Sequence, residues 1–157
     1  LAMAYDSTTV AFAPQFAVLQ DDGKLFRLHG EINVTPTPNS NILFEATYNK
    51  YNMNNLEEAW YRPACELSLS GRCKPMDRLL LRARLSYEGK RKAYDPTRGM
   101  ASDLDGFVDL NIGAHYYISN RWTAFLDVNN ITAADQQRWL GYSSYKFNAM
   151  VGITYKF

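Results

Sequence analysis

The chain has 157 residues, 46% of them apolar, which is enough for one domain with a sizeable core and too little for two independent domains. Its 17 Lys and Arg oppose 16 Asp and Glu with the signs interleaved, so no basic patch for nucleic acid is present. No apolar run approaches the roughly 18 residues of a transmembrane helix, which excludes helical spanning. Aromatic residues reach 14%, an excess that strands, a membrane interface or a ligand surface would explain.

Apolar residues recur at every second position in one segment after another, which is the period of a half-buried β-strand. The pattern is clearest in 79–90 and weakest around 9–19, where Pro14 cannot donate to a strand ladder. The sequence therefore predicts an all-β chain, with one segment of antiparallel strands over 1–157. In chain order, the eight predicted strands cover 9–19, 26–34, 42–48, 65–70, 79–90, 107–118, 122–129 and 147–157.

The connections between these strands differ in length. Short turns are predicted at 35–40, 70–77 and 118–121, and long aromatic-rich loops at 51–62, 93–104 and 132–144. Short turns therefore lie at one end of the sheet and long loops at the other, apart from a short connection at 20–24. Cys65 and Cys73 are eight residues apart, roughly 26 Å in an extended strand, so two free thiols are expected unless a turn intervenes.

An apolar and a polar face also occur in soluble sandwiches and lipocalin-like barrels, so alternation alone leaves the environment open. Three features favour a membrane: strands of about ten residues, an aliphatic belt between two aromatic girdles, and the need to close a sheet that lipid surrounds. The girdle residues are Tyr116, Trp122, Tyr155 and Phe157 at the short-turn end, and Tyr48, Tyr87 and Phe147 at the other. We therefore expect transmembrane β-barrel strands with a polar face toward the lumen.

Charged side chains of both signs share the predicted polar face, so cross-strand ion pairs are expected there. They are Arg27, Glu31, Glu45, Glu66, Arg82, Arg84, Glu88, Asp109 and Asp127. His29 and His115 each have a carboxylate nearby in sequence and could act as general bases, although a hydrogen-bonded lumen histidine is the more common arrangement. Asp103 and Asp105 could ligate calcium but lack a fixed loop pattern. No catalytic residue, metal site or cofactor is predicted, since zinc-spaced Cys/His sets, Ser-His-Asp order and Gly-rich phosphate loops are absent.

Aromatic side chains concentrate in the long loops, where rings can stack on sugars, chelates or peptides. Several of them could instead complete the outer girdle. These candidate ligand contacts are Trp60, Tyr61, Tyr94, Trp139, Tyr142 and Tyr145.

The chain ends in GITYKF, which resembles the C-terminal strand of bacterial outer-membrane β-barrels. That strand has a polar residue, any residue, Gly, two residues of any kind, an aromatic or apolar residue, any residue and an aromatic. Gly152, Tyr155 and Phe157 match this pattern, and Met150 departs from it at the polar position. The resemblance implies that the three matching residues form an assembly signal read by the barrel-assembly machinery.

Residues 57–157 resemble the closing hairpins of TonB-dependent outer-membrane receptors, particularly those of the Bacteroidetes type. The stretch contains EEAWYRPACELSLSGR, YEGKRKAY, FVDLNIGAHYYISNRWTAFLDVNNI and RWLGYSSYKFNAMVGITYKF. The matching features are an Asn-Asn pair ending the penultimate strand, a loop with Trp and Gly-Tyr, and a final Phe: Asn129, Asn130, Trp139, Gly141, Tyr142 and Phe157. A complete receptor of this family has a 22-stranded barrel, a plug domain and a TonB box, and this sequence shows neither of the last two.

The resemblance implies the C-terminal barrel portion of a non-enzymatic receptor in the bacterial outer membrane, which takes up a scarce nutrient through its loops and plug. The implied partners are outer-membrane lipid, the barrel-assembly machinery, the remaining barrel and plug, a TonB-type energy-coupling protein and a surface lipoprotein. Two alternatives stay open: a self-contained eight-stranded barrel with a structural or adhesive role, and a soluble lipocalin-like binding protein, whose Gly-any-Trp motif is missing. In a receptor, the strands near Thr9 and ending at Phe157 should pair with strands outside this sequence, and in a small barrel with each other.

Overall fold

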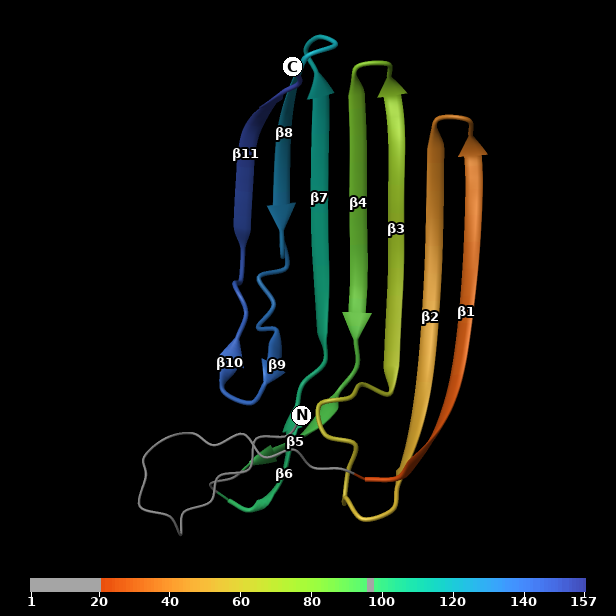
Figure 1. The fold of residues 1–157 in the computed structure, drawn as a ribbon, viewed down its shortest axis with the longest axis vertical. Helices are drawn as coiled ribbons and strands as arrows, with labels where there is room; N and C mark the ends of the chain where they lie inside the picture. The colour runs from red at the N-terminus through yellow and green to blue at the C-terminus, as the bar shows by residue number, and fades with distance from the viewer. Residues whose placement is uncertain (1–20, 96–97) are drawn as a thin grey trace.

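The computed structural model describes residues 21–95 and 98–157, so the predicted strand at 9–19 lies outside the described residues. No helix that could cross a membrane is found in the described part of the chain. Seven long antiparallel strands lie side by side in one sheet (Figure 1). In spatial order they are β1 (Gly23–Thr37), β2 (Ser40–Met53), β3 (Cys65–Met76), β4 (Leu79–Glu88), β7 (Phe107–Tyr117), β8 (Trp122–Asn129) and β11 (Asn148–Tyr155). The predicted all-β antiparallel fold is therefore confirmed.

Tight turns join β1 to β2, β3 to β4 and β7 to β8 at one end of the sheet, and the long connections lie at the other end (Figure 1). Two of the long connections fold into small hairpins, β5 (Arg91–Asp95) with β6 (Met100–Leu104) and β9 (Gln137–Trp139) with β10 (Tyr142–Ser143). The prediction of plain loops at 93–104 and 132–144 missed these hairpins, because strands this short show almost no period.

The predicted turn at 70–77 is wrong for most of its length. Strand β3 continues to Met76, and Gly71 pairs with Ala83 within the β3–β4 ladder. Pro75 lies in a register shift between Cys73 and Met76, where no ladder donor is required of it. The extended strand between the two cysteines keeps them apart, and both thiols are free, as predicted.

Apolar side chains form continuous rows across one face of the sheet. In one such row each residue lies opposite the next on the neighbouring strand: Ile32, Phe44, Leu69, Leu85 and Leu110. The face is open, since Val151 is 82% exposed and Ile153 is 65% exposed. Among the described residues only Ala93 and Leu104, both in the β5–β6 hairpin, are buried apolar side chains. No second layer within the described part of the chain covers this face, unlike the inner face of a soluble sandwich.

Aromatic rings gather on the apolar face near the tight turns. The Trp122 and Tyr155 rings lie 4.6 Å apart between centroids, and the Tyr155 and Phe157 rings 5.1 Å apart. Tyr116 lies opposite Leu79 at the same end. Toward the long loops, Tyr48 is 48% exposed at its place in β2. The register therefore places aromatic residues at both ends of the aliphatic rows, as predicted.

The described sheet is open, with β1 and β11 at its two edges. Within the described residues, the edge strands β1 and β11 do not pair with each other. The predicted pairing of the strand near Thr9 involves residues outside the described part of the chain.

Candidate functional site

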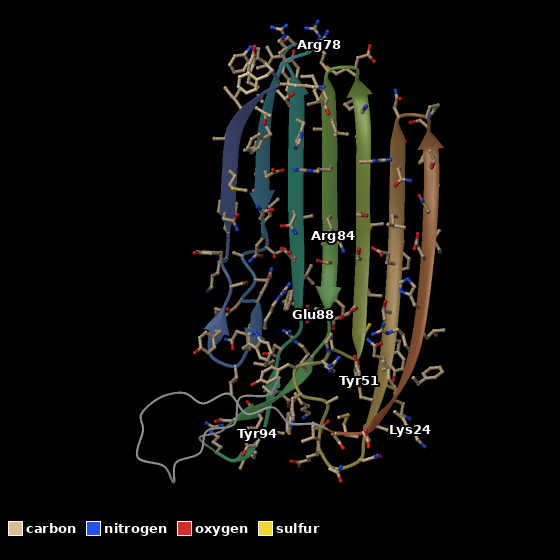
Figure 2. All side chains as sticks on the ribbon, in the orientation of Figure 1. Lys24, Tyr51, Arg78, Arg84, Glu88 and Tyr94 are labelled. Carbon is tan, nitrogen blue, oxygen red and sulfur yellow. The ribbon has the colours of Figure 1, made fainter. Side chains whose placement is uncertain are left out.

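Three connections meet at the loop end of the sheet, and we call their described residues together the loop cap: 54–64, 89–95 with 98–106, and 130–147. They contain all six aromatic residues predicted to contact a ligand. Figure 2 shows Tyr94 in this region, beyond the loop ends of β3 and β4. The cap is the part of the described chain where side chains from several connections converge.

Four of the six predicted aromatic residues come together. The Trp60 and Tyr94 rings meet edge to face at 5.7 Å between centroids, and the Tyr61 and Trp139 rings lie 4.7 Å apart. The Tyr61 hydroxyl donates a hydrogen bond to the Tyr94 carbonyl at 3.4 Å. The structure thus joins three separate connections through one aromatic cluster, which consists of Trp60, Tyr61, Tyr94 and Trp139.

Tyr142 and Tyr145 do not join the aromatic cluster. Tyr142 is 66% exposed and Tyr145 is 88% exposed, and neither ring contacts another aromatic ring in the described residues. Each presents an exposed ring at the loop end of the sheet within the described part of the chain.

Tyr61 occupies a constrained position in the aromatic cluster. Its backbone has a φ of 61°, a left-handed conformation that is uncommon for a bulky residue, and its N–H donates to the Lys92 carbonyl at 2.7 Å. Burial of the ring raises the pKa of the Tyr61 phenol above its usual 10.0. The phenol therefore stays protonated and remains a hydrogen-bond donor at neutral pH.

Arg91 ties the loop cap to the sheet, a role that alternation in the sequence did not reveal. Its side chain is 3% exposed and forms an ion pair with Glu88 at 2.8 Å. It also donates to the Gln137 carbonyl at 2.8 Å, and its guanidinium lies 5.5 Å from the centre of the Phe107 ring. One buried side chain thus connects the end of β4, the start of β7 and the β9–β10 hairpin.

Asn130 organises the connection between β8 and β11. It is 3% exposed with a φ of 48°, and its side-chain oxygen accepts the Ala134 N–H at 3.1 Å. Its amide nitrogen donates to the Ala134 carbonyl at 2.9 Å and to the Tyr145 carbonyl at 3.3 Å. The neighbouring Asn129 donates to the Asn148 side chain at 3.0 Å. The Asn-Asn pair of the sequence therefore closes the base of this loop.

Asp21 fixes the 54–64 connection from the other side. Its carboxylate accepts the backbone N–H groups of Asn54 at 3.1 Å, Asn55 at 3.0 Å and Leu56 at 2.9 Å. These bonds, led by the one from Leu56, lower the pKa of the Asp21 carboxyl below its usual 3.8. Asp21, two residues before β1, thus supplies a charged anchor for the loop that carries Trp60.

The two carboxylates considered for calcium each face a lysine. Asp103 forms an ion pair with Lys92 at 2.8 Å, which lowers the pKa of the Asp103 carboxyl, and Asp105 lies 3.7 Å from Lys90. No group of three or more potential metal ligands occurs among residues 21–95 and 98–157. The first pair lies across the β5–β6 hairpin and the second just outside it, and both are largely exposed to solvent.

Neither histidine contacts a carboxylate within the described residues. The His29 Nδ1 atom lies 2.8 Å from the Thr47 hydroxyl, and the His115 ring packs 6.1 Å from the Phe125 ring. A general base oriented by a carboxylate is therefore not assembled at either position. The arrangement for His29 is the hydrogen-bonded one that the sequence favours.

The residues of the predicted assembly signal occupy the edge strand β11. Gly152 lies opposite Phe125, and a Cβ at position 152 would be 2.5 Å from the Phe125 ring. Glycine is thus required for the ring to lie across the strand. Tyr155 and Phe157 pack together at the turn end, with Phe157 fully exposed.

No family model and no curated protein matches this sequence. Among solved structures, the pyoverdine receptor FpvA of Pseudomonas aeruginosa PAO1 bound to pyoverdine is similar, with a TM-score of 0.71 and 18% identity over 98% of this chain and 24% of that chain. A second P. aeruginosa FpvA structure, bound to heterologous pyoverdines, has a TM-score of 0.72 and 18% sequence identity, and the match covers 86% of this chain and 20% of that chain. The ferric-catecholate import receptor Fiu of E. coli K12 has a TM-score of 0.66 and 17% sequence identity, and the match covers 98% of this chain and 22% of that chain.

These likenesses decide the fold. The chain has the fold of a stretch of TonB-dependent receptor barrel wall. It spans between 20% and 24% of the length of these neighbours, which are outer-membrane transport receptors. The structural comparison agrees with the sequence resemblance on the all-β, antiparallel barrel architecture.

Proposed function

We propose that this chain is part of the barrel wall of a TonB-dependent nutrient receptor in the bacterial outer membrane. The observation that carries the proposal is the open apolar face, whose aliphatic rows run between aromatic ends on a receptor-barrel fold. Such a face is costly in water and stabilising in lipid, where aromatic rings favour the two interfaces. The polar face then lines the lumen, and the loop cap faces the cell exterior.

In this proposal the loop cap captures the nutrient. The exposed rings of Tyr142 and Tyr145 make the first contacts, and the cluster around Tyr61 and Trp139 forms the floor against which a flat ligand stacks. Release inward requires the remaining barrel, a plug domain and a TonB-type energy-coupling protein. A surface lipoprotein would complete the outer side if the receptor is of the Bacteroidetes type.

The first ligands to test are ferric chelates. The structurally similar receptors are the FpvA receptor, which was solved bound to pyoverdine and to ferripyoverdine, and the ferric-catecholate import receptor Fiu. Conjugated, planar chelating groups are suited to stacking on Tyr and Trp rings. We therefore propose a ferric siderophore as the ligand class.

The decisive experiment is fractionation combined with uptake in a Gram-negative host. We expect the intact protein in the outer-membrane fraction, heat-modifiable on gels, and we expect iron-55 uptake from ferripyoverdine or a ferric catecholate that depends on the TonB-type partner. The double variant Tyr142→Ala, Tyr145→Ala should reduce uptake while leaving the amount of folded protein unchanged. Recovery of a folded protein in detergent-free buffer would contradict the membrane proposal.

We also propose that Gly152, Tyr155 and Phe157 direct assembly of the barrel. Phe157→Ser should lower the heat-modifiable population in cells while synthesis continues, because the terminal aromatic pattern is broken. Phe147→Ser is the matched control, since Phe147 is a 59% exposed aromatic just before the opposite end of β11. Equal assembly of the two variants would argue against the signal.

A further inference from the structure

The polar face of the sheet carries an arginine cluster at mid-strand, formed by Arg72, Arg82 and Arg84. Arg72 on β3 lies directly opposite Arg82 on β4, and Arg84 follows two residues later on the same face. Residues directly opposite on neighbouring strands have Cβ atoms about 5 Å apart, and like charges there destabilise a sheet. Figure 2 shows Arg84 between Arg78 at the turn and Glu88 at the loop end of β4. The cluster needs negative charge to offset this repulsion.

One carboxylate supplies part of that charge. Arg82 donates to Asp127 at 2.7 Å, reaching across β7 at Gly113. A Cβ at position 113 would lie 2.5 Å from both the Arg82 Nε and the Asp127 carboxylate, so glycine leaves the path of this ion pair clear. The pair draws Arg82 toward β8 and leaves Arg72 and Arg84 without an ion-pair partner among the described residues.

Two of the remaining carboxylates of the polar face lie far along the strands from the Arg72–Arg82 rung. Glu66 and Glu88 are opposite each other six positions from the Arg72–Arg82 rung, roughly 20 Å away at about 3.3 Å per residue. Asp109, which pairs with Ser86 on β4, is diagonal to Arg84, but it accepts a hydrogen bond from Asn111 at 2.8 Å and forms no ion pair within the described residues. Glu88 is engaged by Arg91, and Glu45 accepts a bond from Ser68 at 3.1 Å. The general expectation of cross-strand ion pairs therefore holds on the long strands for Arg82 and Asp127 and fails for Arg84. Arg72, which that expectation did not include, also forms no ion pair within the described residues.

The arginine cluster opens into a groove. Its volume is about 540 Å³, and the residues that matter here are Asn41, Ser70, Arg72, Arg84, Asn111 and Asp127. The small side chain of Ser70, which lies opposite Arg84 on the polar face, lines the groove beside the guanidinium groups. Arginine presents paired N–H donors that match the two oxygens of a carboxylate, sulfate or phosphate.

We propose that the groove is an oxyanion-binding site, in which Arg72 and Arg84 bind a carboxylate, sulfate or phosphate group and Asp127 holds Arg82 aside. The bound group offsets the repulsion between the opposed arginines. The oxyanion is either a free ligand in the lumen or a carboxylate of another segment of the intact protein. This inference uses only the polar face of the sheet and does not depend on the proposed nutrient or on the loop cap.

The test measures thermal unfolding of the intact protein, in the detergent or buffer where it is folded, with sulfate replacing chloride at constant ionic strength. A free-ligand site predicts that sulfate raises the wild-type Tm by about 2 to 4 °C more than that of Arg72→Gln or Arg84→Gln. Arg121→Gln is the control, because Arg121 is an exposed turn cation outside the groove. Arg84→Lys keeps the charge but loses the paired donors, so it should retain only part of the sulfate effect.

The sign of the mutational effect at low salt separates the other outcomes. If a carboxylate of the same protein fills the site, sulfate has no selective effect and Arg72→Gln and Arg84→Gln each lower the Tm. If nothing occupies the site, removing one arginine relieves repulsion, so both variants match or exceed the wild-type Tm and sulfate acts equally on all. That last result would overturn the proposal.

Discussion

Strands β4, β7 and β8 are joined by backbone ladders in continuous register, whereas the connections of the loop cap are joined mainly by side chains bonded to backbone groups. The sheet exposes its apolar residues, and the loop cap buries the few polar residues that hold it together, Arg91 and Asn130. The difference shows where each part obtains its stability. The sheet depends on what covers its apolar face, and the cap depends on individual hydrogen bonds.

The largest expected effect lies on the apolar face of the sheet. Leu126, 46% exposed near the middle of β8, should face lipid at the midplane. Leu126→Arg should therefore lower the free energy of unfolding in lipid vesicles by about 2 to 4 kcal/mol. Asp127→Asn changes the next residue, which faces the polar side and forms a partly exposed ion pair, so its effect should stay below about 1 kcal/mol. The opposite ranking would mean that the two faces are inverted.

The next largest effect should come from Arg91 in the loop cap. Arg91→Ala removes a buried ion pair and a bond to the Gln137 carbonyl, which should destabilise the β9–β10 hairpin locally by about 2 kcal/mol. Hydrogen exchange of the amides in 137–143 measures this opening. Arg138→Ala provides the matched control, since Arg138 is an exposed arginine of the same hairpin. Equal exchange in the two variants would show that Arg91 does not anchor the hairpin.

A smaller effect should come from Asn130. Asn130→Ala frees the Ala134 N–H and the Tyr145 carbonyl and places alanine at a left-handed φ, so a loss of about 1 kcal/mol is expected. Asn129→Ala removes a single bond to Asn148 and should cost less. Hydrogen exchange across 131–147 compares the two variants. If Asn129→Ala opens the loop more, Asn130 is not its organising residue.

The smallest effect concerns the pH dependence of the 54–64 connection. Because the pKa of Asp21 is lowered in the folded chain, its contribution is present above the usual 3.8 and is lost as pH falls through the lowered value. The NMR signals of the Asn55 and Leu56 amides should shift as pH falls from about 6 to about 2. Asp21→Asn should remove that pH dependence. An unchanged titration in Asp21→Asn would assign it to another group.

The sheet could be predicted from the sequence because its information is periodic. Each alternating run from Phe26 onward forms a strand, and aromatic residues such as Trp122 and Tyr155 lie at the ends that the pattern indicates. The turn at 70–77 was misplaced because Gly71 and Pro75 are read as breakers. Gly71 instead pairs within the ladder, and Pro75 falls in a register shift.

The loop cap could be predicted only in part. Enrichment of aromatic residues in the long loops identified Trp60, Tyr61, Tyr94 and Trp139, which the structure brings together. The anchoring role of Arg91 has no periodic signal, because it depends on contacts between residues 46 positions apart. The arginine cluster likewise depends on register between strands, which the alternation of a single strand does not contain.

Site-directed spin labelling along β4 tests the central claim most directly, namely that one face of this wall meets lipid and the other an aqueous lumen. Cys65 and Cys73 are first replaced by Ser, and single cysteines are then introduced and labelled from Leu81 to Ser86 in the intact protein. We expect oxygen accessibility to peak at 81, 83 and 85, and accessibility to a water-soluble nickel reagent to peak at 82, 84 and 86. Equal accessibility of the two reagents along the whole strand would contradict the account.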